Sequence, residues 1–199
     1  MRAKFYIAAV VVAFTLTSSF SDTVVVHAQE RQPVDATMHT EVTLRRMIEM
    51  RFDASPAEIL PQLLTRVDRY DSTVVEVRFD HALSKTPGQM DVGSRRICVF
   101  ADGRELVDPL VVYDPPHAYG YTVDAEVSTL PLPVRTIVLL YDFTEVRDGG
   151  TALTVRAFYD PLVPGTEDII EPVLTGTLRR TFQTAVEVFG GAYLGDQRP

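Results

Sequence analysis

A short turn between two runs of strand-forming residues constrains this chain more than any other feature. Arg95–Phe100 and Glu105–Tyr113 flank the dipeptide Asp102-Gly103, and Asp-Gly supplies the backbone freedom that a tight hairpin needs. If the strands fold about this dipeptide, residues whose numbers sum to about 204 lie opposite each other. That register pairs Arg96 with Asp108. The sequence therefore predicts an antiparallel hairpin that carries an opposite-charge pair on a mostly apolar face.

Turn signals recur at strand-length intervals around this hairpin. Asp, Gly and Pro clusters separate alternating apolar runs, which is typical of an antiparallel meander. The expected strands are 41–54, 74–83, 95–100, 105–113, 118–128, 134–146 and 151–159.

Three helices are expected beside these strands. The run Ser55–Glu58 places Ser at the N-cap, Pro at the first helical position and Glu three residues after the cap, which is a helix start. A second short helix is expected around Val67–Tyr70. From Thr166 to Phe189 apolar residues recur at spacings of three and four, which predicts a long amphipathic helix. Pro172 inside this run indicates either a start near Glu171 or a kink.

The amino terminus has the pattern of an export signal. Arg2 and Lys4 precede the apolar run Phe5–Leu16, and small residues before Gln29 offer a cleavage point. The apolar run is shorter than the roughly 20 residues that a bilayer span needs. We therefore expect a signal peptide over 1–28, export to the periplasm or medium, and no stable membrane anchor after cleavage. An uncleaved anchor is the alternative, because apolar residues resume at 24–26.

The remaining chain divides simply. Residues 29–40 are polar and aperiodic and are expected to form a flexible leader. Residues 41–190 are expected to form one domain, and 191–199 a tail.

The net charge of −8 and the scattered basic residues argue against a nucleic-acid partner. The single cysteine, Cys98, excludes an intramolecular disulfide, and it is read as a buried apolar residue or, alternatively, as a reactive thiol.

One long helix beside an antiparallel sheet must cross one face of it to bury both apolar surfaces. Because a long sheet twists, it curls around such a helix, and the helix side chains do not fill the space enclosed. The prediction is an α+β fold in which a curved seven-stranded antiparallel sheet wraps around the C-terminal helix and leaves a cavity. A filled interior is the alternative.

The order of elements and five short motifs resemble the SRPBCC superfamily, whose START-like, birch-pollen-allergen-like domains have the helix-grip fold. The bacterial polyketide cyclase/dehydrase-type branch is the most similar. This resemblance implies a hydrophobic ligand cavity but no single activity. The branch often carries a Trp in the second short helix, where this chain has only Tyr70 nearby. The motifs are Asp53–Glu58, Val92–Arg96, Asp102-Gly103, Tyr113–Pro116 and Gly150–Val155.

Candidate ligand-binding residues follow from the pattern and the resemblance. Arg96 and Asp108 resemble the Arg and acidic positions of the cyclase-type branch, where an inward pair would offer donors and an acceptor to a ligand. The sequence favours the plainer interpretation of a partly exposed cross-strand pair, since the adjacent Pro109 is typical of an edge or bulge. Further candidates for lining the cavity, or merely for packing, are Tyr121, Tyr141, Tyr159, Leu178, Phe182 and Phe189.

The familiar catalytic and cofactor motifs are missing from this sequence. Its histidines have no metal-ligand spacing, and it contains no nucleophile elbow, phosphate loop or dinucleotide fingerprint. We therefore expect no metal and no cofactor. The favoured function is an exported, non-enzymatic binder of a small hydrophobic molecule such as a lipid, an aromatic or a polyketide-like compound. The alternatives are a cyclase/dehydratase-type enzyme that uses Arg96, Asp108 and a cavity tyrosine, or a filled domain for protein contacts.

Overall fold

The computed structural model describes residues 31–199, so the expected signal peptide at 1–28 lies outside the described residues. Its elements in chain order are η1 (Ala36–Met38), β1 (Leu44–Phe52), α1 (Pro56–Thr65), α2 (Val67–Tyr70), β2 (Val74–Asp80), β3 (Arg95–Phe100), β4 (Glu105–Asp114), β5 (Ala118–Thr122), β6 (Val134–Glu145), β7 (Thr151–Pro161), α3 (Glu167–Phe189) and β8 (Gly191–Gln197).

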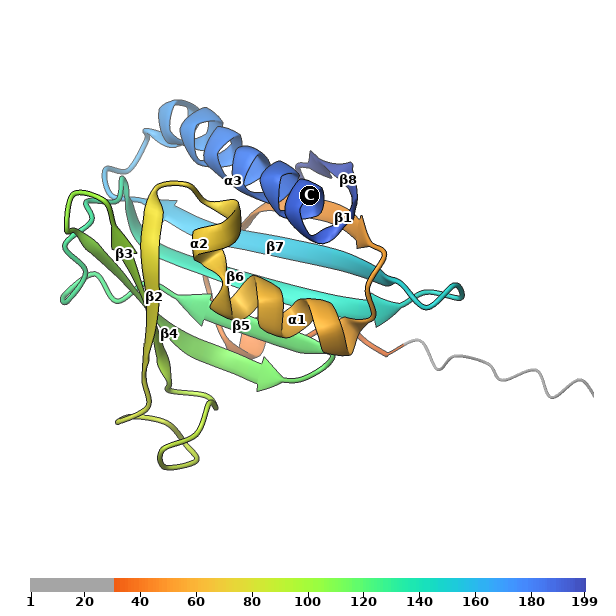
Figure 1. The fold of residues 1–199 in the computed structure, drawn as a ribbon. Coiled ribbons are helices and arrows are strands. Elements are labelled where there is room, and N and C mark those ends of the chain that lie inside the picture. The colour runs from red at the N-terminus through yellow and green to blue at the C-terminus, as the bar shows by residue number, and fades with distance from the viewer. Residues whose placement is uncertain (1–30) are drawn as a thin grey trace, which may run out of the picture. The chain divides into compact units, whose positions relative to one another are not determined.

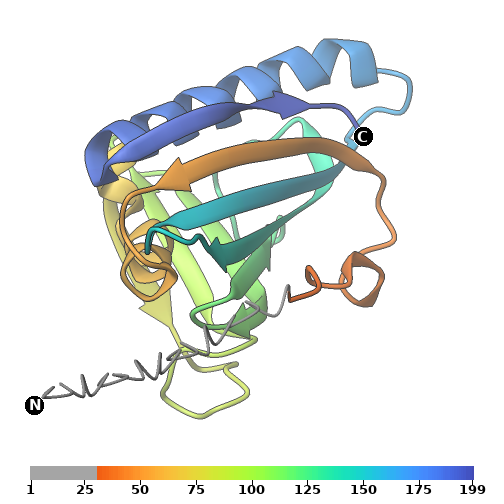
Figure 2. The same ribbon diagram turned by 90° about the vertical axis from the view of Figure 1, so that its right-hand side faces the viewer.

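The strands form one antiparallel sheet in the order β2-β3-β4-β5-β6-β7-β1-β8. It curves beneath α3, which lies across its concave face (Figure 1). The predicted α+β helix-grip architecture is confirmed, but the sheet has eight strands and not seven. The extra strand is β8, which comes from the expected tail and pairs with β1. Figure 2 shows β8 running alongside α3.

The predicted hairpin is present with its predicted register. Arg96 lies opposite Asp108, and Cys98 lies opposite Leu106. Gly103 has a φ of +83°, a left-handed conformation that glycine adopts without steric cost. The Asp-Gly turn therefore sets the register because its backbone geometry selects one pairing of the two strands.

The short helices form as predicted. Ser55 and Glu58 form a capping box at the start of α1, which satisfies backbone N–H groups that the first turn leaves unpaired. The hydroxyl of Tyr70 donates to the carbonyl of Leu63 at 2.5 Å, so α2 is fastened to α1. The long helix begins at Glu167, which excludes the predicted start near Glu171 and leaves Pro172 inside the helix.

Strand β5 is shorter than expected. It ends at Thr122, whereas the alternating pattern predicts a strand to residue 128. The following segment instead hydrogen-bonds to β4: the amide of Asp124 donates to the Val107 carbonyl at 2.9 Å, and the amide of Thr129 to the Glu105 carbonyl at 2.9 Å. Residues 123–132 thus lie beside the first residues of β4 as an irregular segment that is held by hydrogen bonds.

The convex face of the sheet carries a second, smaller core. Val112, Leu140 and Phe158 are buried there beneath Val34 and Val42. The latter two belong to residues 31–43, which we call the strap. The amide of Val34 donates to Asp142 at 2.8 Å. The prediction of a loose leader is thus wrong for residues 31–40, because this segment covers apolar surface that would otherwise face water.

Candidate functional site

A cavity of about 250 Å³ lies between the concave face of the sheet and helices α2 and α3. Strands β2 to β6 form its floor, the middle of α3 forms its roof, and α2 and the 123–132 segment close its sides. Most of its lining side chains are aliphatic or aromatic. The sequence-based expectation of unfilled space between sheet and helix is therefore confirmed, and a completely filled interior does not occur.

The floor of this cavity carries the Arg96–Asp108 ion pair. The two side chains are 4% and 0% exposed, so the partly exposed pair that the sequence favoured is wrong. Arg96 donates from Nε at 3.2 Å and from Nη2 at 2.8 Å, both to Oδ2 of Asp108. Oδ1 of Asp108 is buried and has no hydrogen-bond partner among the described residues. Two atoms are therefore not used by the ion pair: Oδ1 of Asp108, an acceptor, and Nη1 of Arg96, a donor.

Two tyrosines extend this polar centre. The hydroxyls of Tyr121 and Tyr141 lie 3.0 Å apart, and the guanidinium of Arg96 lies over the Tyr121 ring, 4.1 Å from its centroid. Tyr119 stacks on Tyr141 with ring centroids 4.2 Å apart. Because β5 and β6 are neighbouring strands, the register Tyr119↔Tyr141 sets these rings against each other. Arg96 is thus held by an anion on one side and by a π face on the other.

Burial dominates the protonation equilibria of this cluster. It raises the pKa of the Asp108 carboxyl above its ordinary value, although Arg96 opposes the rise. Burial by itself would lower the pKa of Arg96, but Tyr121 and Asp108 hold it well above the usual value. Burial also raises the pKa values of the Tyr121 and Tyr141 phenols. Arg96 therefore stays cationic and both phenols stay protonated at neutral pH.

Cys98 lies beside the same cluster and lines the cavity. It is 2% exposed, and burial raises the pKa of its thiol to about 11. Since the thiolate is the nucleophile, a raised pKa makes this thiol a poor nucleophile at neutral pH. The apolar interpretation of Cys98 is therefore correct, and the reactive one is not.

Six of the seven predicted site residues meet in this cavity. They are Arg96, Asp108, Tyr121, Tyr141, Leu178 and Phe182. Tyr159 does not line it: the ring is 1% exposed and lies 5.9 Å below the guanidinium of Arg45. Phe189, predicted as part of the wall, packs instead edge-on against Tyr70, with ring centroids 5.8 Å apart. Alternation along a strand predicts on which face of the sheet a side chain lies. It does not predict whether that part of the face borders the cavity.

Several lining residues were not among the predicted ones. Thr177 and Thr181 flank Leu178 on α3, and Leu130 and Leu132 reach in from the 123–132 segment. The threonines lie four residues apart, so they share the helix face of Leu178, and this spacing is a signal in the sequence. No comparable signal exists for the two leucines, because their segment has no regular period.

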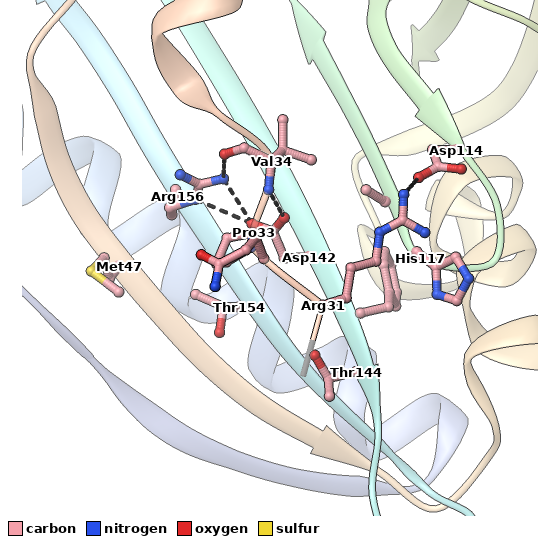
Figure 3. Close-up of a pocket in the computed structure, with 13 residues that line it drawn as sticks. Arg31, Pro33, Val34, Met47, Asp114, His117, Asp142, Thr144, Thr154 and Arg156 are labelled. Carbon is pink, nitrogen blue, oxygen red and sulfur yellow. Dashed lines mark hydrogen bonds and ion pairs between the residues drawn. The ribbon is translucent and has the colours of Figure 1, made fainter. Parts of the chain in front are cut away.

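A larger groove, of about 460 Å³, lies on the convex face between the strap and the sheet. Figure 3 shows Arg156 joined to Val34 and Asp142 by dashed lines, while Arg31 reaches Asp114. Arg156 donates to Asp142 at 2.9 Å and to the Val34 carbonyl at 2.6 Å. These charges are already paired with each other and with the strap backbone. The charged residues of this groove therefore hold the strap against the sheet. The concave cavity is the better candidate for a ligand site.

Residues 31–199 contain neither a metal-binding cluster nor a membrane-spanning helix. No group of three or more His, Cys, Asp or Glu side chains is placed to hold a metal ion. None of the helices in that part of the chain is long and apolar enough to cross a membrane.

Comparison with known proteins identifies the fold and nothing finer. No family model matches the sequence, and no curated protein matches it. The structure, however, is similar to Ara h 8.0201, with a TM-score of 0.54 at 12% identity over 72% of this chain and 95% of that one. It is similar to norcoclaurine synthase of Thalictrum flavum, solved with a transition-state analogue, with a TM-score of 0.53 at 15% identity over 75% and 96%.

A bacterial structure gives the same result. The protein XoxI of Bacillus cereus matches with a TM-score of 0.53 at 14% identity over 73% of this chain and 96% of that one. The chain therefore has the helix-grip fold, as the order of its elements predicted. At these identities the likeness establishes the fold alone, so the function must be argued from the cavity.

Proposed function

We propose that this protein is an exported binding protein that holds a small, neutral and mainly apolar molecule in its concave cavity. One observation carries the proposal: the unfilled space has an apolar lining around a single buried polar centre, Arg96, Asp108, Tyr121 and Tyr141. Ligand sites in proteins have this composition, an apolar wall with a few convergent polar groups that orient the ligand.

The charge of the centre favours a neutral ligand. Arg96 and Asp108 are in contact and together carry no net charge. A charged ligand would add an unpaired charge to a buried site, which is costly unless a counter-ion or hydrogen bonds compensate it. A neutral ligand adds no such charge.

The hydrogen-bond inventory favours a ligand group that both donates and accepts. The Tyr121–Tyr141 contact uses one hydroxyl proton and leaves the second for another acceptor. Nη1 of Arg96 is left over from the ion pair, and Oδ1 of Asp108 is an acceptor without a donor. A phenol or an aliphatic hydroxyl fits this set, because one oxygen can accept from Arg96 or a tyrosine and donate to Asp108.

The size of the cavity limits the ligand. A buried apolar cavity of about 150 Å³ accommodates benzene. On that scale a volume of about 250 Å³ holds about ten non-hydrogen atoms. The inner part of the ligand is therefore a single ring with substituents and not a fused polycyclic system.

Binding can be tested with a matched pair of ligands. 4-Methylphenol carries a hydroxyl where p-xylene carries a methyl group, and we expect 4-methylphenol to bind at least tenfold more tightly because it satisfies the polar centre. Isothermal titration calorimetry on the protein without residues 1–28, with native mass spectrometry of material isolated from the periplasm or medium, measures this. Absence of heat and of thermal stabilisation by both ligands would overturn the proposal.

A cavity-filling variant gives the specific control. Thr181→Phe places a ring into the cavity from α3 and should abolish binding. Gln183→Phe introduces the same ring at an exposed position two residues away that does not line the cavity and should leave binding unchanged. Equal binding by both variants would place the ligand elsewhere.

A cyclase/dehydratase-type activity is the second candidate, and the buried Asp108 favours it. A carboxyl whose pKa is raised by burial is suited to proton transfer, and it lies beside the cavity. The test uses mass spectrometry to measure the loss of water from an aromatic β-hydroxyketone. Asp108→Asn should abolish turnover while the circular dichroism spectrum stays native. Undiminished turnover in that variant would exclude this role.

A further inference from the structure

A second cavity adjoins the first on the outer side of the 123–132 segment. It has a volume of about 310 Å³ and lies between this segment, the start of β6 and Leu162, just after β7. Four side chains line both cavities: Val123, Leu130, Leu132 and Ile137. The two spaces therefore share a wall that is built from these four aliphatic residues.

The backbone of the segment that carries Leu130 and Leu132 is held by hydrogen bonds, but the side chains of these two leucines are not tightly enclosed. The amides of Thr129 and Leu130 both donate to the Glu105 carbonyl, at 2.9 and 3.0 Å. The hydroxyl of Ser128 accepts from the Val107 amide at 2.9 Å. Leu130 and Leu132 themselves are only partly buried. A change of leucine rotamer, which occurs on a fast timescale in partly exposed side chains, can thus join the cavities without breaking the hydrogen bonds of the segment.

The outer cavity has an apolar lining. Besides the shared side chains, Ala125, Pro131, Val134 and Leu162 contribute to it. Leu162 is 56% exposed, and burying such a side chain against an apolar group is favourable. The polar lining residues are Ser128, Thr129 and the exposed Arg135. The two hydroxyls already accept hydrogen bonds from backbone amides of β4. The aliphatic wall of the outer cavity therefore favours a hydrocarbon.

We propose that the two cavities form one site for an amphiphile, with its hydrogen-bonding head in the inner cavity and an apolar tail that passes Leu130 and Leu132 into the outer cavity. This inference rests on the proposed binding function and specifies its ligand class. By the same volume scale, about 310 Å³ accommodates a tail of up to about twelve carbons. Hydroxylated aromatic or aliphatic lipids have this form.

A chain-length series tests the inference. Calorimetric titration with 4-methyl-, 4-ethyl-, 4-butyl- and 4-hexylphenol should show affinity rising about fourfold per methylene, the value expected for burial of each CH₂. The rise should continue through 4-hexylphenol, since the inner cavity alone has no room for a six-carbon substituent. An affinity that stops rising after 4-ethylphenol would overturn the inference.

Two matched variants separate a specific tail site from general hydrophobic binding. Leu162→Asp places a carboxylate in the path of the tail and should weaken 4-hexylphenol at least tenfold while leaving 4-methylphenol unchanged. Leu83→Asp makes the same change at a leucine that is 63% exposed and lines neither cavity, and should leave both affinities unchanged. Ala125→Trp fills the outer cavity from its own wall and should act like Leu162→Asp.

The outcomes distinguish the two proposals. If 4-methylphenol does not bind to the unaltered protein, the proposed function fails and the present inference fails with it. If 4-methylphenol binds but Leu162→Asp and Ala125→Trp leave the chain-length dependence intact, the binding function stands and the tail site is excluded.

Discussion

Arg96 binds Asp108 through one carboxylate oxygen only, with Nε and Nη2 both directed at Oδ2. A bidentate pair would use both oxygens and satisfy the carboxylate. Here Oδ1 is buried without a partner among the described residues, and leaving a buried acceptor unpaired costs free energy. This geometry lowers the stability of the fold at the floor of the cavity, and it leaves Oδ1 as a hydrogen-bond acceptor for another group.

The first prediction concerns the energetics of this pair. Asp108→Asn should lower the free energy of unfolding by about 3–5 kcal/mol, because it leaves the buried Arg96 cation without its counter-ion. Replacing both residues, as in Arg96→Met with Asp108→Leu, should cost far less, since two apolar side chains need no compensation. Urea unfolding at pH 7 measures both.

The exposed pair in the hairpin turn supplies the control. Arg104 and Asp102 are in contact at 2.6 Å but are about half exposed, so Asp102→Asn should have little effect on stability. A double variant as unstable as Asp108→Asn would show that the cost arises from cavity packing and not from the unpaired charge.

The register of this pair was predictable, but its burial was not. Asp102-Gly103 selects one turn, and the turn dictates which residues of the two strands are opposite. Whether the shared face points to the cavity or to solvent depends on the helix that covers the sheet. Pro109 indicated an edge or a bulge, and the register of β4 with β5 does shift between Leu110 and Val112, but such an irregularity does not tell whether the neighbouring Asp108 is exposed. Residue Pro109 pairs with Arg95 inside the sheet, and the 123–132 segment hydrogen-bonds to the preceding residues Glu105 and Val107 of β4, which an alternating pattern does not reveal.

Strand β8 and the strap escaped prediction for a related reason. The β8 sequence contains two glycines and ends in Asp196 and Gln197, so it has little strand propensity of its own and forms by pairing with β1. The strap has apolar residues at Val34 and Val42 with no helical or strand period between them. Both segments are ordered by surfaces that exist only after the rest of the chain has folded.

The second prediction concerns the thiol in the cavity. Cys98, with its pKa raised to about 11, should have about one thiolate per thousand molecules at pH 8. Modification by a thiol-specific disulfide reagent should therefore be slow in the native protein and fast in urea. Saturation with 4-butylphenol should slow it further, because Cys98 lines the cavity. A fast native reaction that the phenol leaves unchanged would contradict the enclosed position of Cys98.

The third prediction concerns the strap. A chain that begins at Thr43 lacks Val34, Ala36 and Val42, which cover the convex core. We expect its free energy of unfolding to fall by roughly 3 kcal/mol, from the loss of apolar burial, while affinity for 4-methylphenol stays unchanged because the strap lies on the opposite face. A chain that begins at Arg31 is the control and should match the longer protein in stability. Weakened phenol binding after strap removal would show that the two faces are coupled.

The fourth prediction concerns pH and the carboxyl-terminal strand. Asp196 of β8 accepts hydrogen bonds from Arg179 at 2.8 Å and from Tyr193 at 2.8 Å, and a contact at 3.6 Å joins it to Arg46 of β1. The hydrogen bond from Arg179, together with that from Tyr193, holds the pKa of Asp196 below its ordinary value. Asp196 is therefore the point where α3, β1 and β8 are fastened together.

A lowered carboxyl pKa in the folded state fixes the sign of the pH effect. The unfolded chain binds the proton more tightly, so this stabilisation is present at neutral pH and is lost as pH falls through the unfolded and then the folded pKa. Asp196→Asn should lower stability by about 2 kcal/mol at pH 7, and the difference from the unaltered protein should shrink below about pH 4. Urea unfolding of both proteins at pH 7, 5 and 3 measures this. A difference that stays constant over that range would mean that Asp196 acts through packing, and its charge would then have no part in holding β8 to α3.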